Sequence, residues 1–248
     1  MADKNMVRLS LSLLAGIIAL NLIHGNCHAF YPLVADDYDP VDVGKTQIEV
    51  YYTSILNQDA SQIGSVGFQV KKGVDANFDI GFKVPVLLPQ ISGIDRSYFR
   101  AKWGLPGYAS REGFSARIEA GVENNPLSGR IIKGALNFSG SLVYSKMLGS
   151  VETHSRIGLA KAGGWHADNL LDWYTMSSVT AVIPVKEIGA ELVFEYNLNT
   201  SETPNPQMIQ FGTKKVLLDW LAVNLGYSVG LNSNSPVRLC AIGLSYIF

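Results

Sequence analysis

Ionisable side chains of both signs recur in the middle of short alternating segments, on the face opposite a run of apolar residues. The acids are Glu49, Asp79, Glu119, Glu152, Glu191 and Glu195, the bases are Lys83, Arg100, Lys102, Arg117, Arg156 and Lys214, and His154 lies among them. Opposite charges follow one another on a single face, as Arg117 and Glu119 do, and residues two apart on a strand are neighbours along its wall. The pattern predicts that these residues line a polar interior, either as ion pairs that stiffen or plug it or as the walls of a narrow passage.

Catalysis would need a nucleophile and a base within hydrogen-bonding reach. His154 is the only histidine on a predicted strand, and Ser155 follows it directly. Adjacent strand residues point to opposite faces, so these two cannot share a proton. A serine from another strand stays an alternative that nothing in the sequence marks, and His166 lies in a predicted loop. We therefore predict that the protein is not an enzyme and has no cofactor, and no metal site because clustered His or Cys ligands are lacking.

The elements that must position these residues are twelve segments in which apolar and polar residues alternate with period two, as in half-exposed strands. They span 44–54, 64–71, 76–86, 95–104, 113–123, 135–146, 151–161, 173–184, 187–197, 207–216, 221–231 and 237–248. Segment 173–184 is apolar on both faces, so its alternation does not indicate which face turns inward. Longer connections rich in Asn, Ser, Gly or Pro, at 57–62, 124–133, 163–171 and 199–206, alternate with short ones; the exceptions are a short outer loop at 87–94 and a long inner turn at 105–111. Such alternation is typical of a membrane barrel and has no reason in a soluble sandwich.

The last segment carries Leu244, Tyr246 and Phe248 on one face and has no charge after Arg238. An edge strand of a soluble sheet is normally protected by charge or proline, whereas a closed barrel has no edge. An even strand number puts both ends of the chain on one side. We therefore predict an all-β fold: a transmembrane antiparallel β-barrel of about twelve strands, an up-and-down meander with both termini periplasmic.

Residues 1–29 have the pattern of a cleaved secretory signal peptide, with Lys4 and Arg8 before an apolar stretch and cleavage expected after Ala29. A membrane anchor and a lipoprotein cut before Cys27 are the alternatives. Residues 30–43 are predicted to be an acidic periplasmic lead-in and 44–248 the outer-membrane barrel. The net charge of −1 gives no basic surface for nucleic acid.

Three runs resemble a known family: YPLVADD at 31–37, GKTQIEV at 44–50 and GVDANFDIG at 73–81. They are similar to the start of the outer-membrane transporter family named for the meta-pathway of phenol degradation. The sequence departs from that family's pattern at Ala35, where threonine is usual, and it lacks the usual glycines before Gly44. The resemblance implies an outer-membrane barrel that transports small molecules.

Together these observations predict a channel or transporter for passive uptake of small molecules, hydrophobic or aromatic ones among them. The alternatives are a plugged structural barrel without transport and a barrel enzyme that modifies lipids. Short outer loops disfavour an adhesion barrel. The expected location is the bacterial cell outer membrane. The expected partners are outer-membrane lipid, a small-molecule solute and the barrel assembly machinery, which would recognise Leu244, Tyr246 and Phe248. We expect a monomer.

Overall fold

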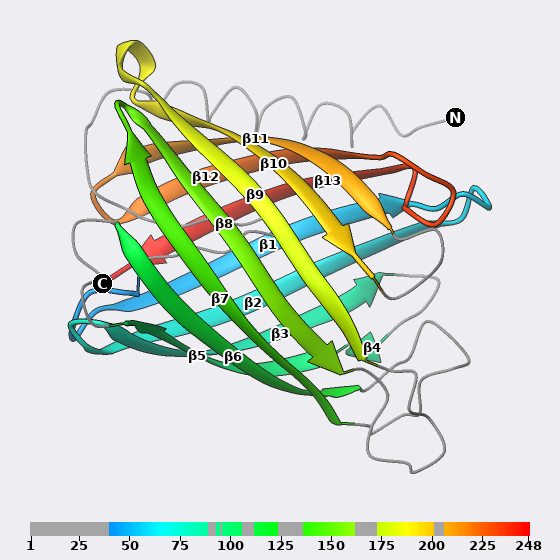
Figure 1. Ribbon diagram of the computed structural model, residues 1–248, viewed down its shortest axis with the longest axis horizontal. Coiled ribbons are helices and arrows are strands. Elements are labelled where there is room, and N and C mark those ends of the chain that lie inside the picture. The colour runs from blue at the N-terminus through cyan, green and yellow to red at the C-terminus, as the bar shows by residue number, and fades with distance from the viewer. Residues whose placement is uncertain are drawn as a thin grey trace, which may run out of the picture.

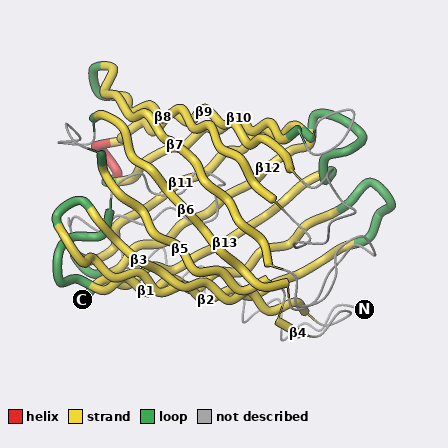
Figure 2. The backbone as a smooth tube through the Cα atoms, turned by 60° about the horizontal axis from the view of Figure 1, so that its bottom comes forward, coloured by secondary structure: helices red, strands yellow, loops and turns green. Residues whose placement is uncertain are grey.

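The alternating segments form the strands of one closed antiparallel sheet. The computed structural model describes residues 40–88, 93–94, 96–105, 112–123, 136–161, 173–200 and 206–248, and the structural statements below refer to these residues. Twelve strands close into a barrel, around which they run obliquely (Figure 1 and Figure 2). They are β1 (Thr46–Leu56), β2 (Gln62–Asp75), β3 (Phe78–Leu88), β5 (Arg96–Gly104), β6 (Gly113–Glu123), β7 (Leu136–Leu148), β8 (Val151–Lys161), β9 (Trp173–Val185), β10 (Ala190–Asn199), β11 (Gln207–Leu218), β12 (Leu221–Gly230) and β13 (Arg238–Ile247). The short strand β4 (Gly93–Ile94) pairs with the end of β3 just before β5 begins.

The last strand closes the barrel by pairing with the first. Strand β13 pairs antiparallel with β1 along its whole length, from Gln47 opposite Ile247 to Leu56 opposite Arg238. Reciprocal backbone hydrogen bonds of 2.8 and 3.0 Å join Thr46 and Phe248 at the seam. All other barrel strands pair with their neighbours in the chain. The predicted all-β barrel with meander order is therefore confirmed, and the start of β1 and the end of β13 lie at the same end.

Several strand ends differ from the predicted ones because turn geometry overrides alternation. Strand β2 continues past residue 71 to Asp75 and carries a register shift between Gly73 and Asp75. Strand β10 begins at Ala190 and not at 187, since Lys186–Ile188 form a single 3₁₀ turn (η1). Gly189 ends that turn with φ of 57°, a left-handed conformation that glycine adopts without steric cost.

The two ends of the barrel carry different connections. Short turns at 76–77, 149–150 and 219–220 lie at the end that contains the seam between Thr46 and Phe248. The opposite end carries the longer connections 57–61 and 231–237. This alternation matches the predicted one where it is described. The predicted loops 124–133 and 163–171, the signal peptide 1–29 and lead-in residues 30–39 lie outside the described residues.

The two faces of the wall are inverted relative to a soluble protein. Large apolar side chains point outward, with Phe99 63% and Ile157 65% exposed. The largest fully buried side chains are instead polar and include Lys71, Gln47, Gln210 and Glu49. No described helix is long and apolar enough to cross a membrane. An apolar exterior around a polar interior indicates surroundings of low polarity.

Candidate functional site

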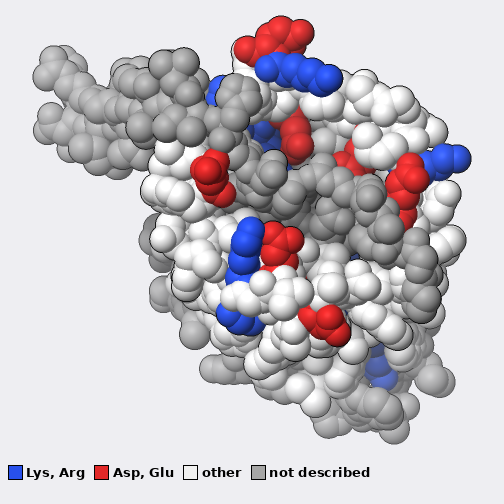
Figure 3. All heavy atoms as spheres, turned by 90° about the vertical axis from the view of Figure 1, so that its left-hand side faces the viewer, with Lys and Arg blue, Asp and Glu red and all other residues white. Residues whose placement is uncertain are grey.

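Every ionisable residue singled out from the sequence lies on the inward face of its strand. Buried ones are Glu49, Asp79, Arg100, Lys102, Glu152, His154, Glu195 and Lys214, and half-buried ones are Lys83, Arg117, Glu119, Arg156 and Glu191. At the short-turn end of the molecule, acidic and basic side chains also lie side by side on the surface (Figure 3). Their placement brings the two signs together. That they line a passage for solutes stays a prediction.

One set of inward residues forms a charged row across strands β1 to β7. Its members face one another in register and are Gln47, Lys71, Gly81, Arg100, Glu119 and Ser139. Lys71 forms an ion pair of 2.8 Å with Glu49, and both side chains are at most 2% exposed. Gln47 donates a 2.6 Å hydrogen bond to the same carboxylate. At the far end Glu119 pairs with Arg117 on its own strand, as the sequence predicts.

Asp79 joins three groups beside the charged row. Its fully buried carboxylate lies 3.6 Å from a guanidinium nitrogen of Arg100 and 3.7 Å from Nζ of Lys102. It also accepts a 3.0 Å hydrogen bond from the backbone N–H of Val41, a buried residue that precedes β1. These partners come from β5 and from the chain before β1, not from β3 itself. A buried carboxylate with two cations and an N–H donor is compensated for its lost hydration.

Val41 is held there by the pairing of residues 42–45 with β2. Val43 bridges Gly73 in parallel orientation, and the N–H of Gly44 donates to the carbonyl of Gly73 at 3.1 Å. A Cβ at Gly73 would overlap the carbonyl oxygens of Val41 and Asp42. Only glycine therefore lets this part of the predicted lead-in lie against the wall.

Other inward glycines let large side chains lie flat along the wall. A Cβ at Gly81 would come within 3.1 Å of Cγ of Arg100, and one at Gly67 would overlap the ring of Tyr51. Lys83 lies over that same ring, with Nζ 5.1 Å from its centroid, a cation–π distance. The side chains of Arg100 and Tyr51 thus extend sideways over glycine positions on the neighbouring strands.

A second set of inward residues forms a polar row across strands β7 to β11. Its members, in register, are Ser145, His154, Thr180, Glu195 and Gln210, and each is at most 3% exposed. Nδ1 of His154 lies 3.0 Å from the hydroxyl oxygen of Ser145. Ser145 is thus the cross-strand serine that no sequence signal marked. Both groups are buried in the wall.

Glu191 is the most exposed acid among the described interior ion pairs. Its carboxylate lies 3.4 Å from Nζ of Lys214, its direct partner across β10 and β11. The Glu191 side chain is 26% exposed, while Lys214 is only 3% exposed. The acid is thus the more accessible member of this ion pair.

Some interior residues were missed by the sequence prediction. Lys71, the partner of Glu49, was left out although it alternates with Phe68 and Val70 on β2. Its inward face follows from the alternation within the predicted segment 64–71, where it lies opposite the apolar residues. Val182 and Val193 contact each other inside the barrel, and an apolar interior residue carries no such signal. Val182 also settles the register of 173–184, since Ser178, Thr180 and Val182 are buried while Val179 is 57% exposed.

No metal site is found among the described residues. No group of three or more His, Cys, Asp or Glu side chains there could hold a metal ion. The pKa of Asp59 is lowered by hydrogen bonds from the hydroxyl and backbone N–H of Ser61, but Asp59 lies in the exposed connection 57–61.

The three residues of the predicted assembly signal point outward beside the seam between β13 and β1. Leu244, Tyr246 and Phe248 are 46%, 42% and 61% exposed. The ring of Tyr246 lies 5.2 Å from that of Trp220 and 5.4 Å from that of Phe248. This cluster sits at the short-turn end, where an aromatic girdle of a membrane barrel is expected. Recognition by assembly machinery stays a prediction.

The closed even-stranded barrel, its apolar exterior and its ion-paired interior define a β-barrel of the outer-membrane type. No family model matches the chain, and no curated protein matches it. The membership suggested by the resemblance to the meta-pathway family therefore stays a prediction.

Solved structures with a similar fold are outer-membrane channels. The COG4313 outer membrane channel from Pseudomonas putida F1 superposes with a TM-score of 0.67 at 12% identity, covering 87% of this chain and 100% of that chain. The KdgM porin gives 0.58 at 7% identity and the NanC porin 0.57 at 8%, each covering 81% of this chain and 98% of the other. At identities this low, the likeness shows a shared fold alone.

Proposed function

We propose that this protein is an outer-membrane channel through which small molecules pass passively, as a monomer. The observation that carries the proposal is the inversion of the wall, with Phe99 and Ile157 exposed outside and ion-paired residues inside. A charge that faces lipid near the midplane costs about 2–4 kcal/mol for Arg or Lys. All predicted interior charges avoid that face. The fold shared with channels and porins supports the same function.

The chemistry of the interior favours small polar solutes. The inward face combines carboxylates, cations and hydroxyls, and this lining exchanges hydrogen bonds with a solute as water does. Passage of hydrophobic or aromatic molecules rests on the family resemblance alone. Because both signs are present on the wall, we expect weak selectivity between small anions and cations.

Single-channel recording in planar bilayers tests the proposal. Steady conductance at constant voltage is expected. The double variant Glu191→Gln with Glu195→Gln should shift the reversal potential in a salt gradient toward anion preference, since it removes two interior negative charges. An unchanged reversal potential would contradict the interior role of these two residues. Protein refolding is checked by heat-modifiable gel migration, so that a missing current is not mistaken for unfolded material.

A plugged structural barrel is the second candidate, and one observation favours it. The ion pairs at Glu49 and Asp79 are almost completely buried. Such pairs stabilise the wall and do not line a water-filled passage. Absence of conductance from folded protein would support this candidate. A lipid-modifying enzyme has less support, because the Ser145 and His154 pair is sealed in the wall. A fluorophosphonate probe is expected to leave Ser145 unlabelled.

A further inference from the structure

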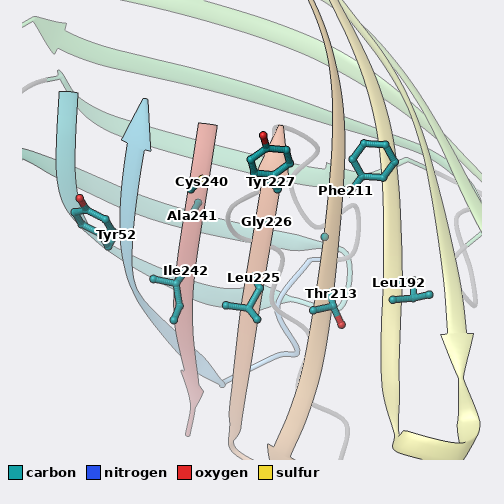
Figure 4. A pocket seen from close by; sticks show the side chains of 11 residues that line it. Tyr52, Leu192, Phe211, Thr213, Leu225, Gly226, Tyr227, Cys240, Ala241 and Ile242 are labelled. Carbon is teal, nitrogen blue, oxygen red and sulfur yellow. The ribbon is translucent and has the colours of Figure 1, made fainter. Parts of the chain in front are cut away.

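The outer wall of the barrel contains a recess of about 590 Å³ over strands β10 to β13 and β1 (Figure 4). Two rows of outward side chains border it. Phe211 and Tyr227 face one another on one side. On the other, Leu225, Ile242 and Tyr52 are in register from β12 to β1. The recess therefore crosses the strands instead of following them.

The recess exists because small residues interrupt both rows. Cys240 continues the row of Phe211 and Tyr227, and Thr213 continues the row of Leu225. Between the rows lie Gly212, Gly226 and Ala241, which face one another on β11, β12 and β13. Their side chains are absent or point inward, so the backbone itself forms the floor.

The outer face on the opposite side of the barrel is built differently. On β6 and β8 the side chains of Ile118 and Ile157 protrude and are 63% and 65% exposed, while Leu225 and Tyr52 beside the recess are 42% and 41% exposed. Both faces belong to the same apolar exterior. The recess is a concave strip on this side of the described wall, where one molecule can be held.

We propose that the recess binds one acyl chain of a membrane lipid. This proposal rests on the outer-membrane placement proposed above, which puts hydrocarbon against this wall. The side chains that border the recess carry no charge, so the site takes a hydrocarbon chain and does not select a headgroup. Strands lie about 4.8 Å apart, so the four spacings from β10 to β1 give a length of roughly 19 Å. One leaflet of a hydrocarbon core about 30 Å thick spans about 15 Å, which such a groove accommodates.

Binding follows from contact, not from exclusion of water. In a bilayer every outward side chain already touches hydrocarbon, so the gain comes from dispersion contacts that a fitted groove adds. A chain in the recess touches Phe211 and Tyr227 on one side, Leu225 and Ile242 on the other, and the backbone below. A second copy of the protein fits less well. A stable protein–protein interface needs about 800 Å² from each partner, and the recess is a strip only two residues wide. The second copy would also need a protruding ridge that matches this strip.

Photocrosslinking tests the site. Protein purified from outer membranes is reconstituted into vesicles of phosphatidylcholine that carry a diazirine in mid-chain, irradiated and mapped by peptide mass spectrometry. We expect several-fold more crosslinks on residues 211–213 and 240–242 than on residues 117–119 and 156–158 of the convex face. The double variant Thr213→Phe with Cys240→Phe fills the recess and should abolish the excess. The matched control Ser155→Phe, on the convex face, should leave it unchanged.

Each outcome has a separate meaning. Equal crosslinking of the two faces in the unchanged protein overturns the lipid site while leaving the membrane placement intact. Crosslinks on neither face overturn the membrane placement and with it the proposed function. Protein–protein crosslinks confined to the recess assign it to a second copy and overturn the proposal. Heat-modifiable migration of both variants shows that a lost signal is not caused by failure to fold.

Discussion

The interior wall formed by the charged row and the wall formed by the polar row differ in the polar chemistry they bury. In the charged row and beside it, Lys71 with Glu49 and Arg100 with Asp79 bring full charges of opposite sign together at 2.8 and 3.6 Å. In the polar row Nδ1 of the His154 ring lies 3.0 Å from the hydroxyl oxygen of Ser145. Both sites are almost inaccessible to water. Equal burial therefore does not predict an equal loss of stability when one partner is removed, because an uncompensated buried charge costs more free energy than an unmet hydrogen bond.

The largest effect is expected at Asp79. Asp79→Ala leaves Arg100 and Lys102 without this carboxylate and frees the N–H of Val41. The free energy of unfolding should fall by about 3–5 kcal/mol. Urea unfolding of the vesicle-bound barrel, followed by tryptophan fluorescence, measures it. Lys45→Ala is the control, since the Lys45 and Asp42 pair is 51% and 72% exposed and should contribute at most about 1 kcal/mol. Equal losses in the two variants would contradict the comparison.

A smaller effect is expected in the polar row. Ser145→Ala removes the hydroxyl beside Nδ1 of His154 and should lower the free energy of unfolding by about 1–3 kcal/mol. The same urea experiment measures it, and Ser155→Ala, on the outward face of the next strand, is the matched control. A loss as large as that of Asp79→Ala would mean that the two rows do not differ in the way described.

Ion selectivity should depend on which interior acid retains water. Glu191 is 26% exposed, whereas Glu195 is 2% exposed and lies between Thr180 and Gln210 in the polar row. Glu191→Gln alone should therefore shift the reversal potential toward anions more than Glu195→Gln alone. A larger shift from Glu195→Gln would place the accessible part of the interior at the polar row.

The smallest effect is expected outside both walls, at Asp59. The hydrogen bonds from Ser61 lower the pKa of Asp59 in the folded state. Its contribution to stability is therefore present above the unfolded value of about 3.9 and is lost as the pH falls through the folded value. Thermal unfolding midpoints of Asp59→Asn and the unchanged protein should differ slightly at neutral pH and converge as the pH falls through the folded value. A difference that grows in acid would have the wrong sign.

Much of the barrel could be predicted from single strands. Alternation in 113–123 and 151–161 gives the bounds of β6 and β8 as the structure has them, and it places Glu119 and His154 on the inward face. Side-chain direction in a strand is a local property with period two, so a short stretch of sequence is enough to determine it. The twelve strands, their order and the contrast between an apolar and a polar face follow from the same pattern.

The partners of each interior charge were decided only by the tertiary structure. Asp79 and Lys83 share a strand face, yet the ion pairs of Asp79 come from Arg100 and Lys102 on β5. Likewise Ser145 meets His154 because β7 and β8 pair in one register out of several that the sequence allows. The register of β7 and β8 is set by the turn at 149–150. Register elsewhere in the sheet also depends on the shift at Gly73 in β2 and on closure of β13 against β1. Register couples every strand to its neighbours around a closed sheet, so no single segment of the sequence contains it.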